Sequence, residues 1–200
     1  GMGSVLRNQG QYAEALAAYR SAASWYQKAG RVDALVSVRT GMANVHEGLG
    51  DYAAALAAYG LALEGAEAER MVATAEVTRL NIGLVHQRLR DFERAQAIFQ
   101  EVLAKARLRE DRRLMASALG NLADVHLDRG AHALALEALE EGRALAIELG
   151  DKRDAASADL QLGFLARERG DPDAALAAYK RALDGMRTLG ALPGVAAALL

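Results

Sequence analysis

Apolar residues recur along the chain at spacings of three and four, the pattern that predicts amphipathic helices. Between residues 32 and 49, for example, they form a single stripe that consists of Leu35, Val38, Met42, Val45 and Leu49. The strict alternation of apolar and polar positions that indicates a half-buried strand is not found. The pattern therefore predicts an all-α protein.

The helical pattern repeats with a period of 40 residues. In each period an alanine is followed four residues later by a large side chain, which gives the pairs Ala15/Tyr19, Ala55/Tyr59, Ala95/Phe99, Ala135/Leu139 and Ala175/Tyr179. Such a period indicates a solenoid of helical hairpins, in which each unit packs only on its neighbours. We expect leading helices near 32–49, 72–89, 112–129 and 152–169, and second helices near 51–69, 91–109, 131–149 and 171–189.

Because an array of repeats grows linearly, we interpret residues 1–200 as one repeat domain. Complete units are expected at 31–70, 71–110, 111–150 and 151–190, with partial units at about 1–30 and 191–200. Gly1 precedes Met2, and Pro193 to Leu200 align with the start of a leading helix that then stops. Both ends favour a fragment of a longer chain, and a natural chain with a frayed last helix is the alternative.

Aspartates, glycines and small residues mark the expected helix ends and helix contacts. Helix-capping aspartates are expected at Asp51, Asp91, Asp151 and Asp171, whereas Ala131 leaves one turn without a side-chain cap. Glycines that can close second helices are Gly30, Gly150 and Gly190. Small residues recur at Ala43, Gly83, Ala123 and Gly163 on leading helices, and these would let paired helices approach closely.

These features resemble tetratricopeptide repeats. The matching residues are Ile82-Gly83, Leu122-Ala123 and Leu162-Gly163 on leading helices, with Ala55, Tyr59 and Ala62 or Ala175, Tyr179 and Ala182 on second helices. The resemblance implies a right-handed superhelical solenoid of antiparallel helix pairs, with about five repeats. The chain departs from the family pattern at the position that often holds tryptophan, where it has Arg39, Arg79, Leu119 and Asp159. Its 40-residue unit is similar to the subclass found in kinesin light chains, G-protein-regulator scaffolds and bacterial regulators.

The resemblance also implies that the leading helices line a concave binding face. Carboxamides recur there at Asn81, Asn121 and Gln161, and Asn44 lies three residues beyond Gly41, which interrupts the series. A carboxamide both donates and accepts hydrogen bonds, so a ladder of them can pair with the main chain of an extended peptide. Alternatively, these amides bond only to neighbouring helices or water. Side chains expected to adjust selectivity are Ser37, Ser117, Gln87 and Asp124.

We therefore predict a scaffold that binds a protein or peptide segment through this amide ladder. The family's cationic clamp for a terminal carboxylate is not expected, because the matching positions are Thr40, Asn44, Asn81, Ser117 and Asn121. The main alternative is a regulatory or self-assembly segment of a larger signalling or transcription-regulatory protein. A homodimer would then form through uncovered apolar residues at the ends, which are Met2, Val5, Leu6, Val195, Leu199 and Leu200.

Three histidines, His46, His86 and His126, also lie 40 residues apart. Equivalent positions in successive units are separated by about a helix diameter, which is too far for ligands of one metal ion. We expect partly buried side chains with one ring nitrogen hydrogen-bonded. The sequence has no glycine-rich phosphate loop and no nucleophile motif, so neither catalysis nor a metal or cofactor is expected.

Composition and charge limit the kinds of site and binding partner that can be expected. The chain has a net charge of −2 and no cysteine, which excludes disulfides and thiolate metal sites. The net charge alternates in sign between units, which argues against a continuous basic track for nucleic acid. The basic cluster at 105–113 is interpreted as a solvated loop, with contact to an acidic partner as the alternative. Without an apolar run of membrane-spanning length or a recognisable leader, we expect a cytoplasmic protein with no membrane partner.

Overall fold

The structure, a computed structural model, describes residues 1–189. Within this range every regular element is a helix, as the apolar pattern predicts. The ten helices are α1 (Met2–Asn8), α2 (Tyr12–Lys28), α3 (Val32–Gly48), α4 (Tyr52–Ala68), α5 (Val72–Arg88), α6 (Phe92–Leu108), α7 (Arg112–Asp128), α8 (His132–Glu148), α9 (Lys152–Glu168) and α10 (Pro172–Thr188). The expected leading helices are α3, α5, α7 and α9. The expected helix after residue 193 and the cap at Gly190 lie outside the described residues.

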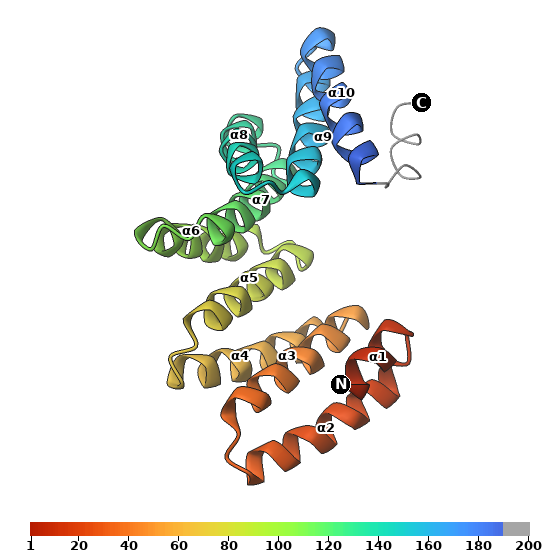
Figure 1. Cartoon of the computed structure of the whole chain (residues 1–200), viewed down its shortest axis with the longest axis vertical. Coiled ribbons are helices and arrows are strands. Elements are labelled where there is room, and N and C mark those ends of the chain that lie inside the picture. The colour runs from red at the N-terminus through yellow and green to blue at the C-terminus, as the bar shows by residue number, and fades with distance from the viewer. Residues whose placement is uncertain (190–200) are drawn as a thin grey trace. The chain divides into compact units, whose positions relative to one another are not determined.

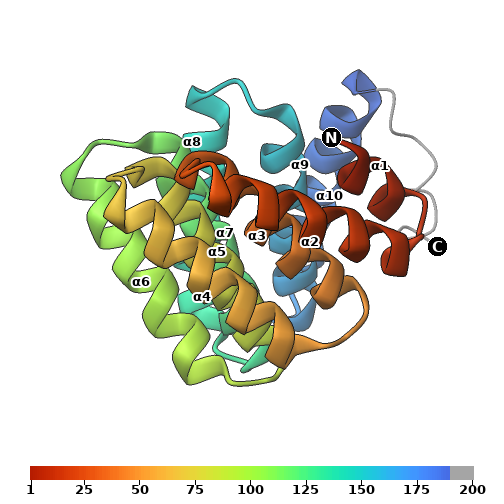
Figure 2. The ribbon, with the colours of Figure 1, turned by 90° about the horizontal axis from the view of Figure 1, so that it is seen from below.

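The chain divides into two compact units, an N-terminal unit of residues 1–98 and a C-terminal unit of residues 99–200. In the N-terminal unit α1 packs on α2 and α3, and α2, α3, α4 and α5 pack in chain order (Figure 1). In the C-terminal unit α7 packs on α8, α8 on α9, and α9 on α10 (Figure 2). Each helix thus packs chiefly on its neighbours in sequence, as expected for hairpin repeats.

The aspartate caps form as predicted. The Asp51 carboxylate accepts a hydrogen bond from the Ala54 amide at 3.1 Å, and Asp151 accepts from the Arg153 and Asp154 amides. Asp91 and Asp171 cap α6 and α10 in the same way. The start of α8 at Ala131 has no side-chain cap, as predicted, but the starts of α2, α3 and α5 also lack one. The absence of a cap therefore does not single out α8.

The turns between helices place every twentieth residue in the left-handed region. Glycine fills this place at Gly10, Gly30, Gly50, Gly130, Gly150 and Gly170. Arg70, Arg90 and Glu110 adopt the same conformation with φ of 54°, 60° and 54°. A residue with a Cβ atom carries a steric cost of about 1–2 kcal/mol there. Three of the turns in residues 1–189 therefore store local strain.

Replacing Glu110 by glycine should raise the free energy of unfolding by about 0.5–1 kcal/mol, because the strain is relieved. The turn itself should persist, since the Asp111 amide donates to the Ala106 carbonyl at 3.0 Å. Urea unfolding followed by circular dichroism measures the change. The matched control is Glu110→Ala, which removes the same charge but keeps a Cβ atom. Equal stabilisation by alanine would mean that charge, not strain, is responsible.

Small residues of the leading helices face large residues of the second helices. One buried cluster joins α3, α4 and α5 through Ala43, Ala55, Tyr59 and Val85, so the Tyr59 ring fills the space toward the next hairpin. In the C-terminal unit Gly163 of α9 faces the Tyr179 ring of α10. These contacts confirm that the small residues allow close packing of the helices.

Charged side chains hold hairpins together at the position that often carries tryptophan in tetratricopeptide repeats. Arg39 donates to the Leu61 carbonyl of α4 at 3.0 Å, and Arg79 pairs with Glu67 of α4. Asp159, only 4% exposed, accepts from Arg143 Nε of α8 at 2.8 Å and from Arg181 Nε of α10 at 2.7 Å. Polar links between helices thus replace an aromatic contact at three of the four positions.

Candidate functional site

The C-terminal unit carries a groove between the leading helices α7 and α9. It consists of two adjoining hollows that share Ala116, Ser117 and Asp154. The first hollow, here called the Gln161 pocket, has a volume of about 260 Å³. Its lining is Ala116, Ser117, Gly120, Asn121 and Asp124 from α7, Ala138, Leu139 and Gly142 from α8, and Asp154, Ser157, Ala158 and Gln161 from α9.

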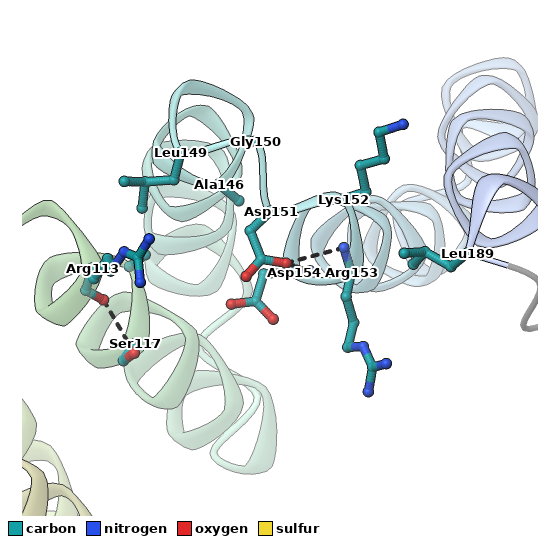
Figure 3. A pocket seen from close by; sticks show the side chains of 11 residues that line it. Arg113, Ser117, Ala146, Leu149, Gly150, Asp151, Lys152, Arg153, Asp154 and Leu189 are labelled. Atoms are coloured by element: carbon teal, nitrogen blue, oxygen red, sulfur yellow. Dashed lines mark hydrogen bonds between the residues drawn. The ribbon is translucent and has the colours of Figure 1, made fainter.

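The second hollow, here called the Arg113 pocket, is larger, at about 550 Å³. It lies around the turn that leads into α9, and basic side chains border it at Arg113, Lys152 and Arg153 (Figure 3). Figure 3 shows Asp151 and Asp154 directed into the space between α7 and α9, whereas Lys152 points away from it. The Arg113 pocket therefore carries side chains of both charges, whereas the charged residues that line the Gln161 pocket, Asp124 and Asp154, are both acidic.

Helical spacing places these side chains on facing stripes. Ser117, Asn121 and Asp124 are separated by four and three residues, so they share one face of α7. Asp154, Ser157 and Gln161 share one face of α9 by the same rule. Because α8 packs on both α7 and α9, it forms the floor between the two stripes. The leading helices line this groove, as the family resemblance implies.

Gln161 and Asp124 connect the two sides of the groove. Gln161 Nε2 donates to Asp124 Oδ1 at 2.6 Å, which joins α9 to α7. Burial raises the pKa of the Asp124 carboxyl, Asp128 adds to the rise, and the bond from Gln161 opposes it. The Asp124 carboxylate thus accepts a hydrogen bond from a neutral group, Gln161, and no lysine or arginine lines the Gln161 pocket.

Asn121, Asp154 and Ser117 form fewer hydrogen bonds or ion pairs across the groove than Gln161 and Asp124 do. Within residues 1–189 the Asn121 carboxamide makes no hydrogen bond, and the Asp154 carboxylate makes neither a hydrogen bond nor an ion pair. Burial and the neighbouring Asp151 raise the pKa of Asp154, while Arg153 lowers it. The Ser117 hydroxyl donates to the Arg113 carbonyl at 3.1 Å. The polar atoms of the Asn121 and Asp154 side chains can therefore form hydrogen bonds with a ligand.

The predicted residues of the N-terminal unit are placed differently. Ser37 and Asn44 border a hollow of about 800 Å³ formed by α1, α2 and α3. Asn44 Oδ1 accepts a hydrogen bond from the Tyr59 hydroxyl, which also lies 3.1 Å from Glu47 Oε2. For Asn44 this bond agrees with the alternative interpretation, in which the amides bond to neighbouring helices and not to a ligand. Asn81 and Gln87 lie half-buried on α5.

The eight predicted residues thus fall into three groups. Those of the C-terminal unit, Ser117, Asn121, Asp124 and Gln161, line one pocket together. Ser37 and Asn44 line another within the N-terminal unit, and Asn81 and Gln87 share a helix. Asp154 and Ser157 are not amides of the 40-residue series, and they were not predicted as site residues. The signal for them was the polar stripe along α9, which reaches Gln161 in steps of three and four residues.

The histidines differ in part from expectation. His46 Nδ1 lies 3.5 Å from Asp51 and His86 Nδ1 lies 3.3 Å from Asp91, but neither nitrogen forms a hydrogen bond. The predicted hydrogen bond to a ring nitrogen is therefore not formed at Nδ1 of either side chain. His126 is buried, and burial lowers its pKa.

Residues 1–189 bring together no group of three or more histidine, cysteine, aspartate or glutamate side chains that could hold a metal ion. None of the helices in this range combines the length and apolar character needed to cross a membrane.

Comparison with solved structures identifies the fold. BtubC (BKLC) from P. vanneervenii is 21% identical, with a TM-score of 0.82 over 94% of this chain and 78% of its own. The Rap conjugation gene regulator of plasmid pLS20, solved with the Phr* peptide, is 17% identical, with a TM-score of 0.75 over 94% of this chain and 52% of its own. This chain therefore spans about half the length of that regulator.

A third structure contains the nearly identical TPR-like repeats assigned to a kinesin light chain of Podospora anserina. It is 13% identical, with a TM-score of 0.74 over 94% of this chain and 93% of its own. No curated protein matches the sequence. The model of the tetratricopeptide repeat family matches residues 1–68, 72–148 and 114–188, which together cover nearly the whole chain. With its hairpin architecture and this match, the chain belongs to the tetratricopeptide repeat family.

Proposed function

We propose that the chain is a protein-binding module that holds an extended peptide segment in the groove between α7 and α9. The observation that carries this proposal is the convergence of Ser117, Asn121, Asp124 and Gln161 on one pocket. The pLS20 Rap regulator, which has the same fold, was solved with a peptide, and this supports a peptide as the ligand. The other predicted contact residues, Ser37, Asn44, Asn81 and Gln87, belong to the N-terminal unit and form a separate prediction.

Asn121 has the main recognition role in this proposal. Its carboxamide makes no hydrogen bond within residues 1–189, so its donor and acceptor can both pair with a peptide main chain. Gln161 contributes differently, because one of its N–H groups is held by Asp124. That bond fixes the Gln161 side chain, so less rotamer entropy is lost on binding.

The test begins with selection of a phage-displayed library of random linear 12-residue peptides on the whole chain. Selected peptides are labelled and their affinities measured by fluorescence anisotropy. Asn121→Ala should weaken binding about thirtyfold, since two hydrogen bonds worth about 1 kcal/mol each are lost. The control, Gln27→Ala, removes an exposed amide from α2 and should leave the affinity unchanged. Failure to select any peptide, or equal affinity for Asn121→Ala, would contradict the proposal.

Self-association through α1 is the second candidate. Met2 is 74% exposed and Val5 is 56% exposed, although Leu6 packs on the core beside them. The corresponding residues at the other end, Val195, Leu199 and Leu200, lie outside the described residues. Static light scattering on the chain and on a Met2→Ser/Val5→Ser variant distinguishes a dimer formed through α1 from a monomer. A dimer that the substitutions dissociate would support self-assembly, and a monomer at high concentration would oppose it.

A further inference from the structure

A further hollow of the N-terminal unit, here called the Arg7 pocket, lies where the ends of α1, α3 and α5 meet the starts of α2 and α4. Its volume is about 610 Å³. It is lined by Arg7 from α1, Tyr12 from α2, Asn44, Glu47 and Gly48 from α3, Leu49 and Gly50 from the following turn, Tyr52 from α4 and Arg88 from α5. Of these residues two are arginines and one is a glutamate, so the pocket carries one net positive charge.

The charged residues of the pocket surround one buried hydroxyl group, that of Tyr59. The hydroxyl donates to Asn44 Oδ1 and lies 3.1 Å from Glu47 Oε2. Burial and Glu47 raise the pKa of Tyr59, and the charges of Arg7 and Arg88 both oppose this rise. The two arginines therefore act on the same group, although they belong to different helices.

Internal contacts occupy the hydrogen-bond acceptors of this cluster. Arg88 Nε lies 2.9 Å from Glu47 Oε1, and the Tyr59 hydroxyl lies against the other carboxylate oxygen. The carbonyl oxygen of the Asn44 side chain is directed at the same hydroxyl. The charge of Glu47 is thus compensated within the protein, and its oxygens are not available to a ligand.

Several donors of the pocket, in contrast, have no acceptor. Within residues 1–189 the Nδ2 group of Asn44 and the hydroxyls of Tyr12 and Tyr52 make no hydrogen bond. Arg7 donates only to the neutral side chain of Asn8, at 3.1 and 3.3 Å, and forms no ion pair in this range. A positive charge and unused donors together favour an anionic acceptor.

Three of these donors are neighbours. Arg7 and Asn44 also border the hollow of about 800 Å³ between α1, α2 and α3, so both lie where the two hollows meet. Asn44 and Gly48 are one turn apart on the same face of α3. The Tyr12 hydroxyl lies against Gly48, because a Cβ atom added there would be 3.3 Å from its oxygen.

We propose that the Arg7 pocket binds a carboxylate group, as carried by an aspartate or glutamate side chain of a partner. Arg7 supplies the charge-assisted hydrogen bonds, with Asn44 Nδ2 and the Tyr12 hydroxyl as the neighbouring donors. One net positive charge matches a singly charged carboxylate better than a doubly charged phosphate. Arg7 lies outside the positions of the family's cationic clamp. The site belongs to the N-terminal unit and does not rest on the peptide groove of the C-terminal unit.

The test is an NMR titration of the isotope-labelled chain with N-acetylglutamate N-methylamide, in a buffer free of other carboxylates and of phosphate. The Nε–H signals of Arg7 and Arg88 and the backbone amides of Leu49 and Gly50 report on the pocket. These signals should shift until the site is saturated. The neutral isostere N-acetylglutamine N-methylamide should leave them in place.

Arg7→Gln should weaken binding of the glutamate probe by at least about fivefold, because the neutral amide cannot replace a charge-assisted hydrogen bond. The matched control, Arg20→Gln, removes the same charge from an exposed position on α2 and should bind as the wild-type chain does. The spectrum of free Arg7→Gln should match that of the wild-type chain outside the pocket, which shows that the variant is folded.

Three results would overturn the proposal. The first is the absence of a saturable shift, or equal shifts with the neutral probe. The second is an equal loss of affinity in Arg7→Gln and Arg20→Gln, which would mean that net charge rather than the pocket attracts the carboxylate. The third is tighter binding of inorganic phosphate than of the glutamate probe, which would assign the pocket to a different anion.

Discussion

Replacement of Asp159 by alanine should lower the free energy of unfolding by about 3 kcal/mol. The Asp159 side chain is buried in α9, and its Oδ1 atom accepts hydrogen bonds from both Arg143 of α8 and Arg181 of α10. Its removal would leave two guanidinium groups without their common acceptor. Both arginines are partly exposed, which allows hydration and keeps the loss toward the lower end of the range for broken buried ion pairs.

Urea unfolding followed by circular dichroism gives the total loss, and hydrogen exchange locates it. Because repeat units are stabilised mainly by their nearest neighbours, faster exchange is expected in α9 and α10 first. Asp173→Ala removes an exposed carboxylate from α10 and should change stability by less than about 1 kcal/mol. If Asp159→Ala unfolds at the same urea concentration as the wild-type chain, the three-helix link does not contribute to stability.

The repeat architecture could be predicted because its signals are local. The 3-4 spacing of apolar residues defines each helix, while the aspartate caps and left-handed glycines mark where it begins and ends. Arg70, Arg90 and Glu110 occupy the glycine position without glycine, yet those turns form in the same places. The 40-residue period therefore predicted the positions of these turns even though the glycine is missing from them.

The partners of charged residues were not predictable in the same way. Asp159 occupies a tryptophan position of the family, but its two arginine partners lie 16 and 22 residues away on different helices. Whether such a residue is buried depends on the packing of three helices, which the pattern of a single helix does not contain. The same reason explains why Asn44 bonds to Tyr59 of the next helix, although its position suggested an exposed ladder.

The candidate site was predicted in part. Ser117, Asn121, Asp124 and Gln161 converge because leading helices of adjacent hairpins face the same side within the C-terminal unit. Asp154 was missed, since it belongs to no series at the 40-residue interval. It lines the groove because the first turn of α9 borders the same hollows as Ala116 and Ser117, in the first half of α7. Sequence periodicity finds positions that recur, whereas a binding pocket also uses residues that occur once.

Gly163→Ala should lower the free energy of unfolding by about 1–3 kcal/mol, although the substitution adds only one methyl group. A Cβ atom at this position would lie 2.5 Å from Cδ1 of the Tyr179 ring and closer still to its Cε1 atom. The ring cannot withdraw freely, because it also packs edge-on against Phe164 with the ring centroids 5.5 Å apart. Relief would therefore require separation of α9 from α10.

Gly120→Ala is the matched control, since Gly120 lies within helix α7 and its added Cβ would meet no atom within 4 Å. Alanine has the higher helix propensity, so this change should stabilise the chain by about 0.5–1 kcal/mol. Thermal and urea unfolding of the two variants should consequently shift in opposite directions. A shift in the same direction for both would show that helix propensity outweighs the glycine–tyrosine contact. Opposite shifts would identify that contact as the reason a small residue is required in the leading helix of this hairpin.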